Sequence, residues 1–189
     1  MNTLGSMVNS KRVFYVTPHA PEGYVERLGL RPDIRLDRLE QDSSEDIAAP
    51  VLASAHAYQS SSTRDELVVN FHVTADLLKR SPNLLLVSTN GAGYDTVDVR
   101  ACTDAGVLVV NQAGGNKEAV AEHVIGMMLC LSKRMIETDR TMRRASGIKR
   151  NAFIGTDVLG KTIGIVGLGN VGSRVAELCR GAFRMRVLA

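Results

Sequence analysis

The sequence has few aromatic residues, few cysteines and no long apolar segment. Aromatic side chains make up 4% of its 189 residues, tryptophan is missing, and Cys102, Cys130 and Cys179 form no C-x-x-C pair. This pattern argues against a disulfide framework or a structural zinc site and favours a reducing, cytoplasmic compartment. No apolar run has the length of a membrane span, and residues 1–12 lack the apolar core of a secretory signal, so we expect a flexible leader there.

An excess of charge of one sign is also lacking. The 23 Lys and Arg residues nearly balance the 20 Asp and Glu residues, and a net charge of +3 is too small to predict nucleic acid or a membrane as the main partner. What is present is an ordinary globular composition, with 44% hydrophobic and 23% charged residues.

Short apolar runs alternate with helical patterns in the first part of the chain. The runs at 13–16, 84–87 and 107–110 predict strands, 51–55 is a further apolar run, helices are predicted at 21–30, 70–80 and 98–105, and 59–62 is predicted to be a polar loop. Strands that alternate with helices are typical of an α/β fold, and continuous apolar runs suit strands buried on both faces of a parallel sheet.

A polar, glycine-rich break at 111–116 precedes the longest helical pattern, which predicts one helix over residues 117–145. Its apolar stripe consists of Val120, Val124, Met127, Met128, Leu131 and Met135. A strand at 162–166, a helix at 173–181 and a strand at 185–188 are predicted to follow. Because this last unit has no neighbouring strands, we expect Ile163, Ile165 and Val187 to be incompletely buried in the monomer or covered by another chain.

The motif G-x-G-x-x-G at residues 167–172 carries the clearest chemical signal, because it directly follows a β-branched strand and opens a helix. Gly167 permits a tight turn, Gly169 lets the backbone approach a pyrophosphate, and Gly172 lets the helix pack against the strand. The alternative is a glycine-rich turn that binds nothing. No Asp or Glu follows Glu177, so the residue that would read the adenosine ribose is missing and the choice between NAD and NADP stays open.

A second candidate site follows the strand predicted at 84–87. The small residues at 89–95 would expose backbone N–H groups at the carboxyl end of that strand, where a carboxylate is a natural guest. The alternative is a plain turn in which Asp95 caps the next helix.

Several ordered motifs then carry a resemblance that covers nearly the whole chain. They are NGAGYDTVD at 90–98, Gly106-Val107, Asn111, Ala121-Glu122-His123, LGKT at 159–162 and GLGNVG at 167–172. The sequence resembles the D-isomer-specific 2-hydroxyacid dehydrogenases, most of all those of the D-3-phosphoglycerate dehydrogenase type. The resemblance implies hydride transfer between NAD(H) and a 2-hydroxy or 2-keto acid.

The resemblance also implies the domains. A flavodoxin-like substrate-binding domain would span 13–112 without its C-terminal return segment, a hinge and a long helix that helps to build a homodimer would span 113–150, and the first βαβ unit of an NAD-binding Rossmann domain would span 151–189. The substrate carboxylate would be held by Asn90, Gly91, Ala92 and Gly93. The cofactor would be held by Ala92, Val120, Gly167, Leu168, Gly169, Asn170, Val171 and Gly172. Many relatives carry arginine at the position of Asn170. Because asparagine is uncharged, one phosphate contact would be weaker in this chain.

The family's catalytic Arg, Glu and His are expected beyond Ala189, and none of the four histidines of this chain matches the catalytic one. His56 would follow a strand of the first domain and either line its cleft or be merely solvated. His123 is expected to be packed on its helix. We therefore expect an N-terminal part of a dehydrogenase that is inactive by itself, with a non-catalytic NAD-binding or interaction module as the alternative.

Overall fold

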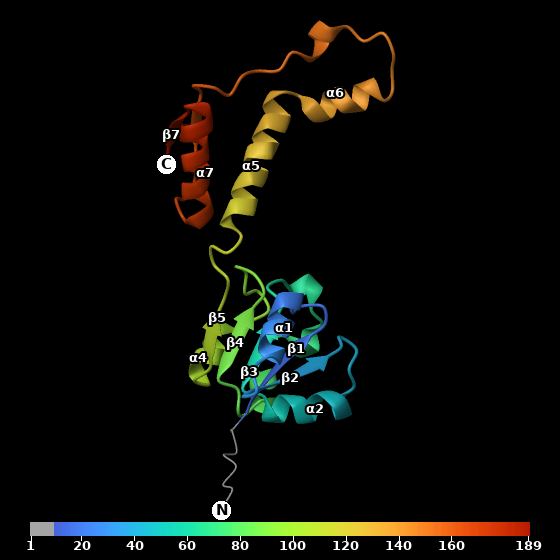
Figure 1. The fold of residues 1–189 in the computed structure, drawn as a ribbon, viewed down its shortest axis with the longest axis vertical. Coiled ribbons are helices and arrows are strands. Elements are labelled where there is room, and N and C mark those ends of the chain that lie inside the picture. The colour runs from blue at the N-terminus through green and yellow to red at the C-terminus, as the bar shows by residue number, and fades with distance from the viewer. Residues whose placement is uncertain (1–9) are drawn as a thin grey trace, which may run out of the picture. The chain divides into compact units, whose positions relative to one another are not determined.

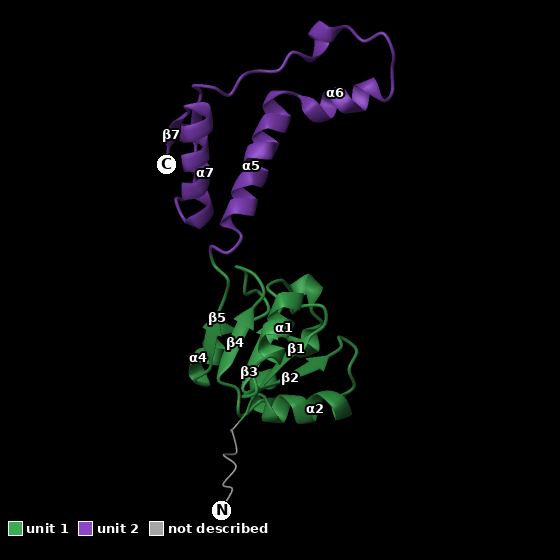
Figure 2. Ribbon diagram, in the orientation of Figure 1, with its two compact units in different colours: residues 1–113 green, residues 114–189 purple. Residues whose placement is uncertain are grey.

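The computed structural model describes residues 10–189, which form two compact units, 10–113 and 114–189 (Figure 2). Residues 1–9 of the predicted leader lie outside the described part of the chain. The predicted end of the leader at residue 12 is wrong, because Lys11 and Arg12 already belong to the first strand. Among residues 10–189 no helix is both long and apolar enough to cross a membrane.

The first unit is built on a five-stranded sheet whose strands all run parallel (Figure 1). The strands are β1 (Lys11–Val16), β2 (Ile34–Leu39), β3 (Ala57–Ser60), β4 (Leu86–Thr89) and β5 (Leu108–Val110). Their order in the sheet is β2-β1-β3-β4-β5, the order of flavodoxin-like folds, in which ligands bind beyond the carboxyl ends of the strands. The α/β architecture expected from the sequence is therefore confirmed.

Four helices connect these strands: α1 (Glu22–Gly29), α2 (Glu45–Ser54), α3 (Ala75–Arg80) and α4 (Val99–Asp104). Two single turns of 3₁₀-helix, Arg64–Glu66 and Val69–Phe71, follow β3. On one face of the sheet, Phe14, Tyr58 and Val87 are fully buried and pack with apolar residues of α2, α3 and α4. The rings of Phe14 and Tyr58 stack with their centroids 4.1 Å apart, so the centre of the sheet is fixed by large side chains.

Several predicted elements of this unit were wrong. The apolar run at 51–55 lies largely in α2, which ends at Ser54, and is not part of the strand alternation. The supposed polar loop at 59–62 begins inside β3, where Gln59 and Ser60 are buried. The buried Ser60 hydroxyl lies 3.3 Å from the Thr96 hydroxyl, within hydrogen-bonding distance, whereas Nε2 of the buried Gln59 has no partner among the described residues. β2 was missed because the alternation of Ile34 and Leu36 with charged residues is broken by the adjacent charges of Asp37 and Arg38.

The predicted strand at 107–110 exists but is not buried on both faces. It forms the edge of the sheet as β5, and Leu108 is 62% exposed. The helix predicted over 70–80 begins only at Ala75, where the Thr74 side chain accepts a hydrogen bond from the Leu77 backbone N–H. This cap fixes the start of α3 because it satisfies one of the free N–H groups of its first turn.

The second unit contains α5 (Lys117–Ser132), α6 (Met135–Met142), a 3₁₀ turn at Arg150–Phe153, β6 (Thr162–Gly164), α7 (Asn170–Phe183) and β7 (Arg186–Leu188). β6 and β7 pair in parallel, and α7 connects them, as in the βαβ unit that the sequence predicts. Buried Val175 and Cys179 of α7 pack with Ala121 of α5. Ile163, Ile165 and Val187 are only partly buried, as expected for two strands without neighbours.

The single helix predicted over 117–145 is wrong. The chain breaks at Arg134, whose left-handed φ of 54° separates α5 from α6. The guanidinium of Arg134 bonds both carboxylate oxygens of Glu137 and the carbonyl of Ala152, which holds the break in place. The predicted apolar stripe is also only partly right, since Val124 packs on the core while Leu131 is 79% exposed.

Candidate functional site

The glycine loop, residues 167–172, joins β6 to α7 in the second unit. Gly167 has a φ of +94°, a conformation that side chains of L-residues rarely adopt, so the turn requires glycine at this position. A Cβ atom at Gly172 would lie 2.0 Å from the carbonyl oxygen of Gly167, so the first turn of α7 fits against the loop only without a side chain. Both glycines therefore build the loop.

Gly169 has a different role. A Cβ at this position would meet no atom within 4 Å, and its φ of −75° is open to any residue. Packing within the protein therefore does not require glycine at this position. A ligand that approaches the backbone closely would require it. This is the geometry that a loop open to a phosphate group needs.

The backbone N–H groups of Asn170, Val171 and Gly172 at the start of α7 have no acceptor in the described part of the chain, and no side chain caps this helix. Such N–H groups and the positive end of the helix dipole favour an anion. An open pocket of about 290 Å³ lies beside them and is lined by Gly169, Asn170, Lys117 and Arg174, among others. Arg174 is paired with Glu118 at 2.7 Å, and this ion pair ties the beginning of α7 to the beginning of α5.

The positions of the other predicted cofactor residues of the second unit give weaker support for a cofactor site. Leu168 and Val171 belong to the loop and to the first turn of α7, and Val120 lies at the start of α5, partly exposed. The Asn170 side chain is turned towards Gly114, where a Cβ would lie 3.2 Å from its Nδ2 atom. Their contacts with a cofactor stay a prediction, as does that of Ala92, which belongs to the first unit.

The second candidate, the 90–93 loop, follows the carboxyl end of β4 in the first unit. The carbonyl oxygens of its last three residues turn towards donors of the protein. The Thr89 hydroxyl lies 3.1 Å from the Gly91 oxygen and 2.8 Å from the Gly93 oxygen, and Asn111 Nδ2 donates to the Ala92 oxygen at 2.8 Å. The N–H groups of Gly91, Ala92 and Gly93 have no acceptor among the described residues. The loop thus presents backbone donors, which is what an anion requires.

The glycines of this loop are needed for packing. A Cβ at Gly91 would lie 2.8 Å from the Ser62 hydroxyl oxygen, and a Cβ at Gly93 would lie 3.0 Å from the Ser62 carbonyl oxygen. The Ser62 N–H in turn donates to the Asn90 side chain. The predicted alternative, in which Asp95 caps α4, is wrong because Asp98 accepts the capping hydrogen bond from the Ala101 N–H.

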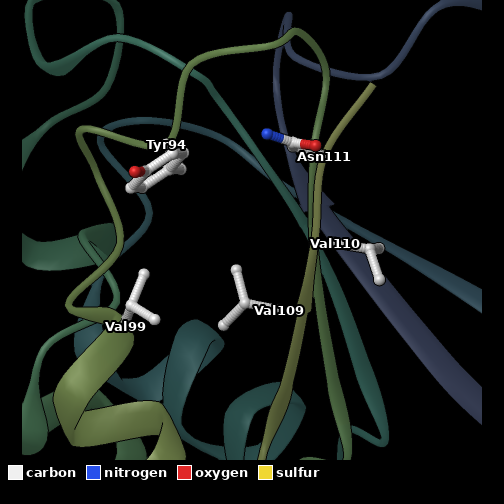
Figure 3. A pocket seen from close by; sticks show the side chains of 5 residues that line it. All are labelled: Tyr94, Val99, Val109, Val110 and Asn111. Atoms are coloured by element: carbon white, nitrogen blue, oxygen red, sulfur yellow. The ribbon is translucent and has the colours of Figure 1, made fainter. Parts of the chain in front are cut away.

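A pocket of about 550 Å³ adjoins this loop and is lined by Tyr94, Val99, Val109, Val110 and Asn111. Figure 3 shows the side chains of Tyr94, Val99 and Val109 around an open space, while Val110 points to the other side of β5. No basic side chain lines the pocket, so it suits an apolar group next to the 90–93 loop.

The histidines do not take part in either loop. His56 follows α2 rather than a strand, and its Nδ1 accepts a hydrogen bond from the Arg12 N–H at 3.0 Å. Desolvation, with smaller contributions from Lys11 and Arg12, lowers the pKa of His56. His123, which was expected to be packed, is exposed. Within residues 10–189, no group of three or more His, Cys, Asp and Glu side chains is arranged to hold a metal ion.

The sequence motifs identified both loops but missed two residues that shape the 90–93 loop. Ser62 was assigned to a polar loop, and Thr89 was treated only as a member of a small-residue segment. The only available signal was their position at the carboxyl ends of the strands, where ligands of such folds bind: Thr89 is the last residue of β4, and Ser62 lies two residues beyond the end of β3.

Comparison with known proteins agrees with these features. The sequence model of the family described as "D-isomer specific 2-hydroxyacid dehydrogenase, catalytic domain" matches residues 32–180. The chain is 38% identical over 117 residues to D-3-phosphoglycerate dehydrogenase of Archaeoglobus fulgidus and 43% identical over 117 residues to that of Mycobacterium leprae. Each match covers 62% of this chain and 22% of the relative, so the chain matches about a fifth of the length of these relatives.

Solved structures give the same result. The structure of D-lactate dehydrogenase from Aquifex aeolicus complexed with NAD and lactic acid superposes with a TM-score of 0.72 and 26% identity, covering 93% of this chain and 50% of that one. A 2-hydroxyacid dehydrogenase from Ketogulonicigenium vulgare superposes with a TM-score of 0.70 and 26% identity, covering 94% of this chain and 53% of that one.

Proposed function

Because the chain belongs to the family of D-isomer specific 2-hydroxyacid dehydrogenases, we propose that it supplies two anion-binding loops of such an enzyme. The glycine loop would hold the pyrophosphate of NAD, and the 90–93 loop would hold the carboxylate of a 2-hydroxy or 2-keto acid. When bound, the nicotinamide would supply or accept the hydride. The domain organisation would be that of a substrate-binding part at 13–112 and the start of a nucleotide-binding part at 151–189.

The observation that carries this proposal is the glycine loop. Its outer glycines are required by the fold, whereas Gly169 has free space around it and lies beside N–H groups that lack an acceptor among residues 10–189. A pyrophosphate fits this arrangement because it brings negative charge to the positive end of α7 and needs a close approach to the backbone. Basic residues also outnumber acidic ones by about two to one in residues 114–189, which favours an anionic ligand at long range.

The proposal also includes the class of substrate, the oligomeric state and the cellular location. The relatives at about 40% identity act on D-3-phosphoglycerate, as their names say, which supports a small D-2-hydroxy acid as substrate. Exposed Met127 and Leu131 of α5 and Ile136 and Met142 of α6 support a homodimer formed through these helices. A cytoplasmic location would keep the three free cysteines reduced.

No histidine in residues 10–189 is hydrogen-bonded to either loop, so we expect no turnover from these 189 residues alone. A steady-state assay with NADH and keto acids would test this. Clear activity would show that a catalytic group within this chain has been overlooked.

The test of NAD binding is the variant Gly169→Val. Because a Cβ at this position would meet no atom within 4 Å, the second unit should stay folded while the space for the pyrophosphate is filled. Calorimetry should show NAD binding by the native chain and a loss of more than about tenfold in the variant. Gly126→Val, at another open glycine on α5, adds the same volume away from the loop and should bind normally. Equal affinity of Gly169→Val and the native chain would contradict the proposal.

A further inference from the structure

The Thr89 side chain lies between the end of β4 and the 90–93 loop. Thr89 is fully buried at the end of β4, and its hydroxyl lies within hydrogen-bonding distance of two carbonyl oxygens, those of Gly91 and Gly93. No other side chain of the described residues bonds two carbonyls of the 90–93 loop. A buried hydroxyl so placed can share its one proton between both carbonyls and thereby restrain the orientation of two peptide groups.

The planar trans peptide links each carbonyl to the N–H of the next residue, and the two point in opposite directions. When the Gly91 carbonyl turns towards Thr89, the N–H of Ala92 turns away from it. When the Gly93 carbonyl turns towards Thr89, the N–H of Tyr94 does the same. Neither N–H has an acceptor among residues 10–189. Thr89 therefore orients two free donors, on alternate residues, towards the side opposite its hydroxyl.

We infer that Thr89 is a positioning residue that aligns the Ala92 and Tyr94 N–H groups to bind the two oxygens of one substrate carboxylate. This rests on the proposed function in taking the ligand to be a carboxylate, and it adds Tyr94 to the donors expected from the sequence. Neither Gly91 nor Gly93 has a positive φ, so the orientation of their carbonyls comes from hydrogen-bonding partners and not from a backbone conformation that only glycine adopts.

The surroundings keep this arrangement rigid. Asn111 holds the intervening Ala92 carbonyl, and the Gln112 N–H donates to the Gly91 oxygen at 2.9 Å. Ser62 packs against the opposite side of Gly91 and Gly93. Loss of the Thr89 hydroxyl should therefore leave the loop folded, but it removes the one donor to the Gly93 carbonyl among the described residues and should loosen the Tyr94 N–H most.

The experiment uses the full chain, isotope-labelled for NMR, titrated with D-lactate and separately with D-lactamide, which lacks the carboxylate. In the native chain the Ala92 and Tyr94 amide signals should shift together with D-lactate and much less with D-lactamide. Thr89→Val, which keeps the shape of the side chain, should raise the Kd for D-lactate about tenfold, while Thr89→Ser should restore most of the affinity.

Thr103→Val is the matched control, because it removes a threonine hydroxyl that bonds only the Val99 carbonyl within α4. It should bind D-lactate like the native chain. Unchanged affinity in Thr89→Val, or native amide signals of Ala92 and Tyr94 that do not respond to D-lactate, would overturn the inference. NAD is absent from this titration, so these outcomes leave the test of the glycine loop independent. If Thr89→Val does not fold, Thr89→Ala takes its place, and unchanged affinity for D-lactate in that variant would overturn the inference.

Discussion

The substitution Gly172→Ala should disrupt the second unit while leaving the first intact. The added Cβ would lie 2.0 Å from the Gly167 carbonyl oxygen, far inside van der Waals contact. The start of α7 cannot simply move away, because buried Val175 and Cys179 anchor that helix against α5. Overpacking of this kind costs about 3 kcal/mol, which corresponds to roughly a 100-fold rise in the population of the opened unit.

The cysteines provide the assay. All four tyrosines lie in residues 1–113, so intrinsic fluorescence would report only on the first unit. Cys179 is fully buried in the second unit and Cys102 is fully buried in the first, and burial raises the pKa of both thiols. In Gly172→Ala, labelling of Cys179 by a thiol reagent should become about 100-fold faster while that of Cys102 stays unchanged, because labelling follows opening.

Gly169→Ala is the control, since a Cβ there meets nothing and should leave Cys179 protected. The argument would fail if Gly172→Ala and Gly169→Ala gave the same labelling rate at Cys179. That result would mean that the helix adjusts to the added methyl group at no cost, and that close packing is not the reason for glycine at this position.

Two further predictions concern the first unit. Tyr58→Phe removes a buried hydroxyl that donates to the Phe71 carbonyl at 3.0 Å, so urea denaturation should show a loss of about 1–2 kcal/mol, and an unchanged midpoint would contradict this. The Ser61 hydroxyl donates to Glu66 and lowers the pKa of that carboxyl, so its contribution to stability is present at neutral pH and lost as the pH falls through the lowered folded-state pKa. Glu66→Gln should therefore be less stable than the native chain at pH 7, and this difference should shrink in acid; a difference that is constant with pH would refute the assignment.

The fold could be predicted where local pattern and tertiary environment agree. The alternation of strands and helices indicated the α/β class, and the succession of strand, glycine loop and helix indicated the βαβ unit around α7. The errors arise where distant contacts decide. Arg134 adopts a left-handed conformation between two helical segments and is held there by Ala152, and no local property of the sequence indicates this break.

The candidate site shows the same division. Both loops could be identified from their glycines as candidate binding sites. The reason why Gly91 and Gly93 must be glycine could not be predicted. Gly91 and Gly93 are glycine because Ser62, which follows β3, packs against them after β4 has paired with β3. The free N–H groups likewise depend on Asn111, which reaches the Ala92 carbonyl only when β4 and β5 pair, together with the local contacts of Thr89.

Both loops would bind their anions through backbone N–H groups, and this has a consequence for pH. A peptide N–H has no ionisable proton in the physiological range, so its affinity for an anion depends only on the ionisation of the ligand. Side-chain cations near the glycine loop, such as Lys117, lie in exposed positions where salt screens them. The affinity for NAD should therefore be nearly constant between about pH 6 and 9 and should fall only moderately as salt is added. The affinity of a site built on histidine would change strongly with pH, and that of a site built on lysine would change strongly with salt.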